Sequence, residues 1–296
     1  MNVGVAGLGN MGSAIAERLI ETGNAVAVWN RSAEKCKPLA AAGATVAVSA
    51  AALAEAADTV ITILTDATAI DAVYDGPTGL LAGDIKDKLF VEMSTVPPHV
   101  GTALAERVRA KDAVFVECPV GGTTVPARQG KLIGLLGADP ADAARAMPLL
   151  NQLCRRVEHC GSVGAGATLK LALNLPLMVY WQALGEALAL CRPLGLDPDR
   201  VIDLMAESSG GANVLKVRGP GLVKLLKGED PGPAMFTLDN CIKDLRIMLA
   251  EGARCGVEMP LVARALACFE EASRQGLGAT EGAGLSVYWS KRGANK

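Results

Sequence analysis

The hydrophobic positions in the first half of the chain follow two alternating patterns. Short apolar runs rich in β-branched residues are typical of buried strands, and apolar residues every three or four positions are typical of helices. The strand pattern covers residues 2–6, 25–29, 59–64, 89–92, 113–117, 131–136 and 155–159. The helix pattern covers residues 13–20, 49–57, 66–74, 98–110 and 140–153. Strands separated by helices indicate an α/β fold with a mainly parallel sheet, whose ligands bind at the carboxyl ends of the strands.

The second half of the chain has helical patterns only. Residues 167–194 are almost unbroken helix-forming sequence, with Pro176 as the interior flaw and Gly195 as the stop. Further helices are predicted at residues 199–208, 221–226, 238–255 and 261–275. A long, nearly all-apolar helix is buried on all sides, and one domain rarely covers so much of it. We therefore predict a homodimer or homotetramer formed through this helix.

The first strand runs directly into a glycine-rich turn and then a helix. The turn reads Gly7-Leu8-Gly9-Asn10-Met11-Gly12. Gly7 permits the tight turn, Gly9 lets the backbone approach a pyrophosphate, and Gly12 lets the helix lie close to the strand. The helix N-terminus then offers free N–H groups to the phosphates. This context predicts a dinucleotide site in a Rossmann-type, doubly wound domain over residues 1–164, followed by an all-α domain over residues 165–296.

The end of the second strand indicates which dinucleotide binds. NAD-binding units usually carry Asp or Glu there for the ribose hydroxyls, but this chain has Asn30-Arg31-Ser32. Arg31 can pair with a 2′-phosphate and stack on adenine, while Asn30 and Ser32 offer neutral hydrogen bonds. Ser32 is also placed to cap the next helix. NADP(H) is therefore favoured over NAD(H).

Other exit loops of the predicted sheet carry further candidates. Leu64-Thr65 and Ser94-Thr95 follow strands, so both pairs are expected to touch the cofactor, and Thr95 offers a hydroxyl as well as its backbone.

Composition excludes several classes of function. Half of the 296 residues are apolar, only 3% are aromatic, and the net charge is −2, which argues against a nucleic-acid surface. No apolar run is suited to span a bilayer, and the first strand has no basic flank of the kind that precedes a secretory signal. The eight cysteines show no zinc spacing, so we expect no metal site and mostly buried, reduced thiols. These features predict a cytoplasmic protein.

The scarcity of histidine and tyrosine narrows the chemistry. His99 and His159 are the two histidines, and their positions at a helix start and a strand end indicate structural roles. No tyrosine has a lysine four residues on. The proton of a dehydrogenase reaction must therefore come from another group.

Lys170 and Asn174 are the candidates for that proton transfer. They lie four residues apart and share one helix face, in a segment from Leu169 to Leu177 that is otherwise apolar. Burial depresses the pKa of a lysine toward neutrality, as a general acid–base group requires. Asn174 can orient the ammonium group or hold the substrate oxygen. The alternative is a lysine whose charged end reaches solvent beside a packing amide.

Four motifs now resemble those of the β-hydroxyacid dehydrogenase family, which includes 3-hydroxyisobutyrate dehydrogenase, tartronate semialdehyde reductase and glyoxylate/succinic semialdehyde reductases. They are the glycine turn, residues 117–132, residues 161–174 and Lys243-Asp244-Leu245. The resemblance implies that Lys170 is the catalytic acid–base group and that Asn174 assists it. It also implies that Lys243 reaches the site from the second domain, touching cofactor or substrate, with Thr95 at the nicotinamide side. The Asn30-Arg31-Ser32 run is similar to that of the NADPH-using semialdehyde and glyoxylate reductases.

The chain departs from the family pattern in the substrate loop. The family reads Pro-Val-Ser-Gly-Gly where this chain has Pro119-Val120-Gly121-Gly122-Thr123. The serine hydroxyl is absent, Thr123 is the candidate to replace it, and the Gly121 and Gly122 amides can still form an anion nest. Cys118 stands in place of the usual alanine and is expected to serve packing. A bulkier or uncharged carbonyl substrate is thus left open.

The sequence predicts an NADP(H)-dependent oxidoreductase that reduces a small aldehyde or keto acid, or oxidises a 3-hydroxy acid. One alternative is an imine reductase on the same fold, although such enzymes usually have an acid or tyrosine in place of Lys170. The other is an NADPH-binding sensor without chemistry. The exact substrate, the physiological direction and the choice between dimer and tetramer stay open.

Overall fold

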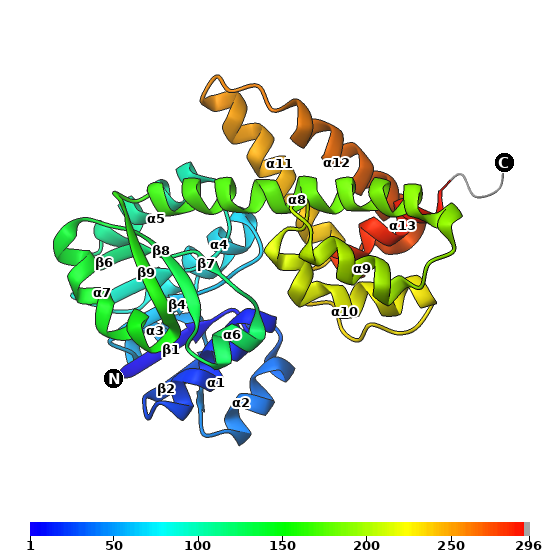
Figure 1. Ribbon diagram of the computed structural model, residues 1–296. Helices are drawn as coiled ribbons and strands as arrows, with labels where there is room; N and C mark the ends of the chain where they lie inside the picture. The colour runs from blue at the N-terminus through cyan, green and yellow to red at the C-terminus, as the bar shows by residue number, and fades with distance from the viewer. Residues whose placement is uncertain (293–296) are drawn as a thin grey trace. The chain divides into compact units, whose positions relative to one another are not determined.

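The structure, a computed structural model, describes residues 1–292 (Figure 1). The chain divides into two compact units, the first comprising Met1–Lys170 and the second beginning at Leu171. The boundary predicted between residues 164 and 165 lies six residues before this division and stays a prediction.

The first unit is built on one sheet, which within residues 1–292 has nine strands in the order β3-β2-β1-β4-β5-β6-β8-β7, with β9 paired to β8. The strands are β1 (Asn2–Ala6), β2 (Ala25–Trp29), β3 (Thr45–Val46), β4 (Thr59–Thr62), β5 (Leu89–Glu92), β6 (Val114–Glu117), β7 (Val120–Gly121), β8 (Leu132–Gly137) and β9 (Cys154–Gly161). The six strands from β3 to β6 run parallel, as predicted. The β8 strand runs antiparallel to β6 and β7.

Helices cover both faces of this sheet (Figure 1). They are α1 (Asn10–Glu21), α2 (Lys37–Ala41), α3 (Ala50–Ala56), α4 (Ala67–Tyr74), α5 (Pro98–Arg109), α6 (Thr124–Arg128) and α7 (Pro140–Leu153), with the 3₁₀ turns η1 (Ala33–Cys36) and η2 (Leu80–Ala82). Side chains of a strand alternate between the faces. Leu89 and Val91 accordingly join a core cluster with α1 and α7, whereas Phe90 packs with α3, α4 and α5. The first unit is therefore a doubly wound α/β structure.

Local capping explains where two of these helices begin. The Asp66 carboxylate accepts a hydrogen bond from the Ala69 N–H at 2.8 Å and so caps α4. Ser49 caps α3 through the Ala52 N–H at 3.0 Å. Ser32 occupies the N-cap position of η1, but its side chain makes no cap hydrogen bond, so the predicted capping contact is wrong.

Over residues 171–292 the second unit consists of helices joined by loops, apart from a single bridge between Thr237 and Glu281. Its elements are α8 (Ala165–Cys191), which begins in the first unit, η3 (Arg192–Leu194), α9 (Pro198–Glu207), α10 (Asn213–Lys227), α11 (Leu238–Arg254), α12 (Pro260–Ala272), the π-turn η4 (Ser273–Leu277), η5 (Gly282–Gly284) and α13 (Leu285–Lys291). Trp181, Leu215, Leu245, Phe269 and Leu285 belong to their shared core. The predicted all-helical second half is confirmed for the residues described.

The α8 helix is the longest element, at 27 residues (Figure 1). It continues through Pro176, and the segment after it stops at Gly195, whose φ of 61° is left-handed. Leu173 and Leu190 on this helix are 57% and 81% exposed. In a single chain, α8 is therefore not buried on all sides. Among residues 1–292, no helix has the length and apolar character needed to cross a lipid bilayer.

Candidate active site

The glycine turn has the geometry that a dinucleotide site requires. Gly7 adopts a left-handed φ of 97°, and a Cβ at Gly12 would collide with the Gly7 carbonyl oxygen. Gly9 is the N-cap of α1, and no atom lies within 4 Å of the place its Cβ would take. The first turn of α1 carries no acidic side chain. Open backbone at a helix N-terminus without a carboxylate is suited to phosphate.

Asn30 ties this turn to the end of β2. Its Oδ1 accepts a hydrogen bond from the Leu8 N–H at 2.9 Å, and its Nδ2 donates to the Ser32 carbonyl at 3.1 Å. The side chain thus braces two loops that are both candidates for cofactor binding. Sequence reasoning assigned Asn30 neutral hydrogen bonds to the cofactor but did not find this bracing role.

Arg31, next along the chain, is exposed. Within residues 1–292, no carboxylate pairs with its guanidinium group. The side chain is therefore available to an anionic group from solution.

A chain of buried hydrogen bonds links the exit loops of β4 and β5. Thr62 Oγ1 donates to Glu92 Oε2 at 2.5 Å and accepts from the Tyr74 hydroxyl at 2.8 Å. Glu92 Oε1 accepts from the Ser94 N–H at 2.7 Å, and Ser94 Oγ accepts from the Leu64 N–H at 2.7 Å. This network fixes the backbone beside the exposed Thr65 and the half-buried Thr95.

Burial dominates the electrostatics of the network. It raises the pKa of the Tyr74 phenol well above its usual value, and the neighbouring Glu92 raises it further. Burial also raises the pKa of the Glu92 carboxyl, which its hydrogen bonds with Ser94 and Thr62 partly oppose. Both groups therefore favour their neutral forms more than in water.

The predicted substrate loop lies at the edge of the sheet. Gly121 pairs with Ile133 of β8, and Gly122 has a left-handed φ of 124°. A Cβ at Gly121 would meet only Ile133, at 3.6 Å, which is an ordinary contact. Packing therefore does not require glycine at 121, whereas the backbone requires it at 122. Thr123 is the N-cap residue of α6, without a side-chain cap bond.

Cys118 precedes this loop and is fully buried. Burial raises the pKa of its thiol well above the usual value. A buried thiol that resists ionisation is inert, which agrees with the predicted packing role.

Lys170 and Asn174 both lie on α8, one turn apart, and both are half-buried. Asn174 Nδ2 donates a hydrogen bond to Asp244 Oδ2 at 3.1 Å. Asp244 is 1% exposed, and its Oδ1 forms an ion pair with Lys243 Nζ at 3.1 Å. Asp244 therefore connects two of the predicted site residues in the second unit.

A recess of about 570 Å³ opens beside Lys243 in the second unit. Its walls come from α11, α12 and η4 and are rich in charge. They comprise Asp239, Ile242, Lys243, Arg246, Ile247, Glu270, Ser273 and Arg274. Three of the charges are engaged within the recess, because Arg246 pairs with Glu270 at 2.7 Å and Ser273 donates to Asp239 at 2.7 Å.

The surroundings of His159 agree with its predicted structural role. Its ring Nε2 lies 2.8 Å from the Ala138 carbonyl oxygen, next to β8. His99 lies exposed in the first turn of α5.

Two family models cover most of the chain. The NAD binding domain of 6-phosphogluconate dehydrogenase matches residues 2–161, and the NAD-binding domain of NADP-dependent 3-hydroxyisobutyrate dehydrogenase matches residues 164–286. Glyoxylate/succinic semialdehyde reductase 1 of Arabidopsis thaliana is 34% identical over 278 residues, which are 94% of this chain and 94% of that protein. The chain belongs to the β-hydroxyacid dehydrogenase family. As a β-hydroxyacid dehydrogenase it is an oxidoreductase that acts on a CH–OH group and binds a nicotinamide cofactor.

Solved structures of similar proteins share this fold. The protein Psf3, in complex with NADP⁺ and 2-OPP, superposes with a TM-score of 0.86 at 26% identity, covering 97% of this chain and 99% of that one. An imine reductase from Pseudomonas sp. superposes with a TM-score of 0.64 at 21% identity, covering 96% of this chain and 97% of that one. The second likeness is one of fold alone.

Sequence reasoning missed three buried carboxylates in this β-hydroxyacid dehydrogenase, namely Glu92, Glu117 and Asp244. Glu92 and Glu117 end adjacent parallel strands and are register partners. A polar residue that ends a buried strand in a parallel sheet is a signal that could have found both. Asp244 stands inside a motif from which only Lys243 was selected.

Proposed function

We propose that the protein is an NADPH-dependent reductase of a small aldehyde or keto acid of the semialdehyde or glyoxylate class. It would also oxidise the corresponding hydroxy acid. The observation that carries the proposal is the pair Lys170 and Asn174 on α8, with the Asn174 amide fixed by the buried Asp244. The similarity to a glyoxylate/succinic semialdehyde reductase supports the substrate class.

The glycine turn supports binding of the cofactor's pyrophosphate between Gly7 and Gly12, against the first turn of α1. The exposed Arg31 supports a 2′-phosphate, since its guanidinium can pair with the phosphate and stack on the adenine. Leu8, Asn10 and Met11 contribute backbone groups of the same turn. NADP(H) is accordingly the preferred cofactor.

The exit loops of β4 and β5 hold the nicotinamide side through Leu64, Thr65 and Thr95. The hydrogen-bond network from Tyr74 to Ser94 supports this assignment, because it fixes the backbone on which these residues stand. Lys243, held by Asp244, contacts the cofactor or the substrate.

NADPH, when bound, supplies the hydride for the carbonyl carbon. In reduction, Lys170 is the ammonium form and its Nζ donates a proton to the developing alkoxide oxygen. In oxidation, neutral Lys170 Nζ takes the hydroxyl proton. Asn174 orients the oxygen without adding a charge that would compete with Lys170.

The substrate loop recognises the rest of the substrate. The backbone N–H groups of Gly121, Gly122 and Thr123 form a nest for a carboxylate. Since a Cβ at Gly121 would meet only an ordinary contact, the loop has room for one small side chain at this position.

The test is NADPH oxidation with succinic semialdehyde, glyoxylate, methylmalonate semialdehyde, tartronate semialdehyde and an uncharged aldehyde. Wild type and Lys170→Ala are compared at equal active-site concentration. We expect a carboxylate-bearing aldehyde to react fastest, and the variant to lose two to four orders of magnitude in kcat, roughly, with unchanged NADPH affinity. Near-normal turnover by the variant would refute the role of Lys170.

A cyclic imine in the same panel tests the alternative chemistry on this fold. If the imine is reduced fast and no carbonyl compound is turned over, the enzyme is an imine reductase and the proposed reaction is wrong. Tight NADPH binding without turnover of any compound indicates a sensor.

The exposed Leu173 and Leu190 support self-association through α8, as a homodimer or homotetramer. Light scattering after size-exclusion chromatography distinguishes these states from a monomer. All eight cysteines are free thiols, which supports a reducing compartment such as the cytoplasm.

A further inference from the structure

Glu117, the last residue of β6, is a buried carboxylate with an unusual set of donors. It is 3% exposed. Its Oε1 accepts hydrogen bonds from the N–H groups of Gly164 at 2.7 Å, Gly166 at 2.8 Å and Ala167 at 3.2 Å. These N–H groups belong to the start of α8, where a helix has no internal partners for them. One oxygen thus satisfies the first turn of the helix that carries Lys170.

Glycines of two other elements make room for this carboxyl group. A Cβ at Gly137 of β8 would overlap it. A Cβ at Gly101 of α5 would lie 3.0 Å from Oε2. The surroundings are therefore shaped around the side chain, which leaves it little freedom to move.

The same residue connects two parts of the proposed site. Lys170 follows Gly166 by four residues, so it lies one turn along the same face of α8. In the other direction, Cys118 and Pro119 lead directly from Glu117 into the loop of Gly121 and Gly122.

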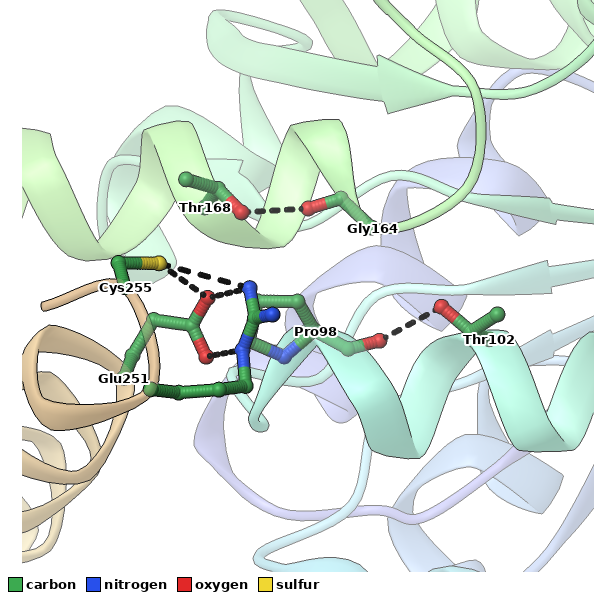
Figure 2. Close-up of polar contacts among 7 residues, drawn as sticks. Pro98, Thr102, Gly164, Thr168, Glu251 and Cys255 are labelled. Carbon is green, nitrogen blue, oxygen red and sulfur yellow. Dashed lines mark hydrogen bonds and ion pairs between the residues drawn. The ribbon is translucent and has the colours of Figure 1, made fainter.

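The helix start also carries a side-chain hydrogen bond within its own first turn. Figure 2 shows the Thr168 hydroxyl donating to the Gly164 carbonyl, at 2.8 Å. Gly164 therefore has its N–H on Glu117 and its carbonyl on Thr168.

We propose that Glu117 is a positioning residue for the proton transfer, holding the first turn of α8 against the end of β6 so that Lys170 keeps one position relative to the substrate loop. The inference rests on the proposed role of Lys170.

Because the Glu117 carboxyl can ionise, its effect on the reaction should depend on pH, which the effect of a non-ionisable contact would not. Burial raises the pKa of the Glu117 carboxyl to about 7, the three N–H donors oppose this rise, and Glu92 adds to it. The other titratable groups that face it are Cys118 and Cys160. An ionised carboxylate accepts hydrogen bonds more strongly than a neutral carboxyl, so the anchor is firmest above neutral pH.

The main experiment compares wild type with Glu117→Gln, which keeps the shape and one acceptor oxygen but does not titrate. We expect kcat to fall about tenfold, because a small misplacement of a reacting group is costly. NADPH affinity should stay within about twofold. In wild type kcat should rise with pH near 7, and in the variant this rise should be absent. Unchanged kcat with an unchanged profile would overturn the inference.

Glu92→Gln is the matched comparison, since Glu92 is a buried glutamate in register with Glu117. Because its charge raises the pKa of Glu117, its removal should move the rise in kcat to lower pH without abolishing it. If each variant abolished the rise of kcat with pH, the titration would belong to Glu92 and Glu117 together. That result would contradict a separate role of Glu117.

A double variant tests whether Glu117 acts through Lys170. Adding Glu117→Gln to Lys170→Ala should cost no further activity, because the group being positioned is already gone. The same tenfold loss in that background overturns the inference. Full activity of Lys170→Ala alone instead overturns the proposed function, so the two failures are distinguishable.

Gly101→Ala serves if Glu117→Gln does not fold. It retains the glutamate and replaces a glycine inside a helix, a change that favours the helix by itself. Its methyl group would lie 3.0 Å from Oε2 and displace the carboxyl by a few tenths of an ångström. We expect kcat to fall about two- to fivefold with NADPH affinity unchanged, and unaltered kcat contradicts the inference.

Discussion

Glu117 in the first unit and Asp244 in the second are both buried carboxylates beside residues of the proposed reaction. Glu117 is held by three backbone N–H groups. Asp244 is held by the Lys243 ammonium and the Asn174 amide. A carboxylate that meets only neutral donors does not recover its full hydration energy, so its protonation is sensitive to pH near neutrality. A carboxylate beside a cation has its charge matched by a side chain instead.

The difference separates two ways of building a reactive site. Backbone donors fix a position, because they move only when the helix moves. Charged side chains fix an electrostatic balance, because removing one charge leaves the other uncompensated. Substitutions in the two units should therefore fail differently, and the following measurements test this.

The largest effect is expected where a side-chain charge is removed. Asp244→Asn removes the carboxylate that pairs with Lys243 and changes the acceptor of Asn174 Nδ2. We expect kcat/KM to fall about 10- to 100-fold, since a hydrogen bond to a charged group contributes about 1.5–3 kcal/mol.

Glu251→Gln is the control for this substitution. Glu251 is also a buried carboxylate on α11, paired with Arg254 at 2.6 Å (Figure 2). It should leave kcat/KM within about twofold. An equal loss in both variants would show general damage to α11 and remove the special role of Asp244.

The backbone-held carboxylate should appear in the pH dependence of stability. The pKa of Glu117 is raised from 4.5 to about 7 in the folded chain, so the folded state binds more protons between these values. Its contribution is present below about pH 4.5 and is lost as the pH rises through 7, with a magnitude on the order of 3 kcal/mol at most. Denaturant unfolding at pH 5 and pH 8 should show a smaller decline for Glu117→Gln than for wild type. An equal decline contradicts the raised pKa.

The choice of cofactor tests recognition by a charged side chain at an exposed position. Arg31→Ala should raise the KM for NADPH about tenfold and leave the KM for NADH unchanged, because only NADPH carries the 2′-phosphate. Lys35→Ala removes a nearby exposed charge and serves as the control. If both substitutions raised the KM for NADPH equally, Arg31 would contribute only to the general positive potential and would not bind the 2′-phosphate specifically.

The smallest effect is expected at the substrate loop, where we propose that backbone N–H groups bind the carboxylate. Gly121→Ser introduces a side chain whose Cβ meets only Ile133, at 3.6 Å, so stability should change by less than about 1 kcal/mol. The KM for a carboxylate-bearing aldehyde should fall about three- to fivefold, since a new hydroxyl can donate to the carboxylate. The KM for an uncharged aldehyde should stay the same, and a parallel fall would contradict recognition of charge at this loop.

The sequence was sufficient for elements with a long enough pattern. The strands at residues 2–6, 25–29 and 89–92 and the helix at residues 140–153 have the predicted bounds, because their apolar periodicity is uninterrupted. The strands β3 and β7 were missed because two residues show no alternation, and the helices α2 and α6 were missed because five residues do not complete a second helical turn. The first part of α10 was also missed, since Gly219, Pro220 and Gly221 conceal a helix that begins at Asn213.

Site residues with a local sequence signal were likewise found, and those that depend on distant contacts were missed. The glycine turn was found because each glycine answers a local need of the backbone, as the left-handed φ of Gly7 shows. Glu117 was not found as an anchor because its donors lie 47 to 50 residues away. Asp244 bonds to an amide 70 residues distant. Such contacts depend on how the chain folds back, and no local pattern of hydrophobicity contains them.

The double hydrogen bond of Asn30 has a consequence for redesign of cofactor preference. An engineer who wants an NADH-using enzyme would place an aspartate at this strand end. That carboxylate would still accept from the Leu8 N–H, but it would face the Ser32 carbonyl with two acceptors and no donor. The exchange would thus loosen the very loop it is meant to reprogram. A successful redesign would have to supply a new donor for the Ser32 carbonyl in the same step.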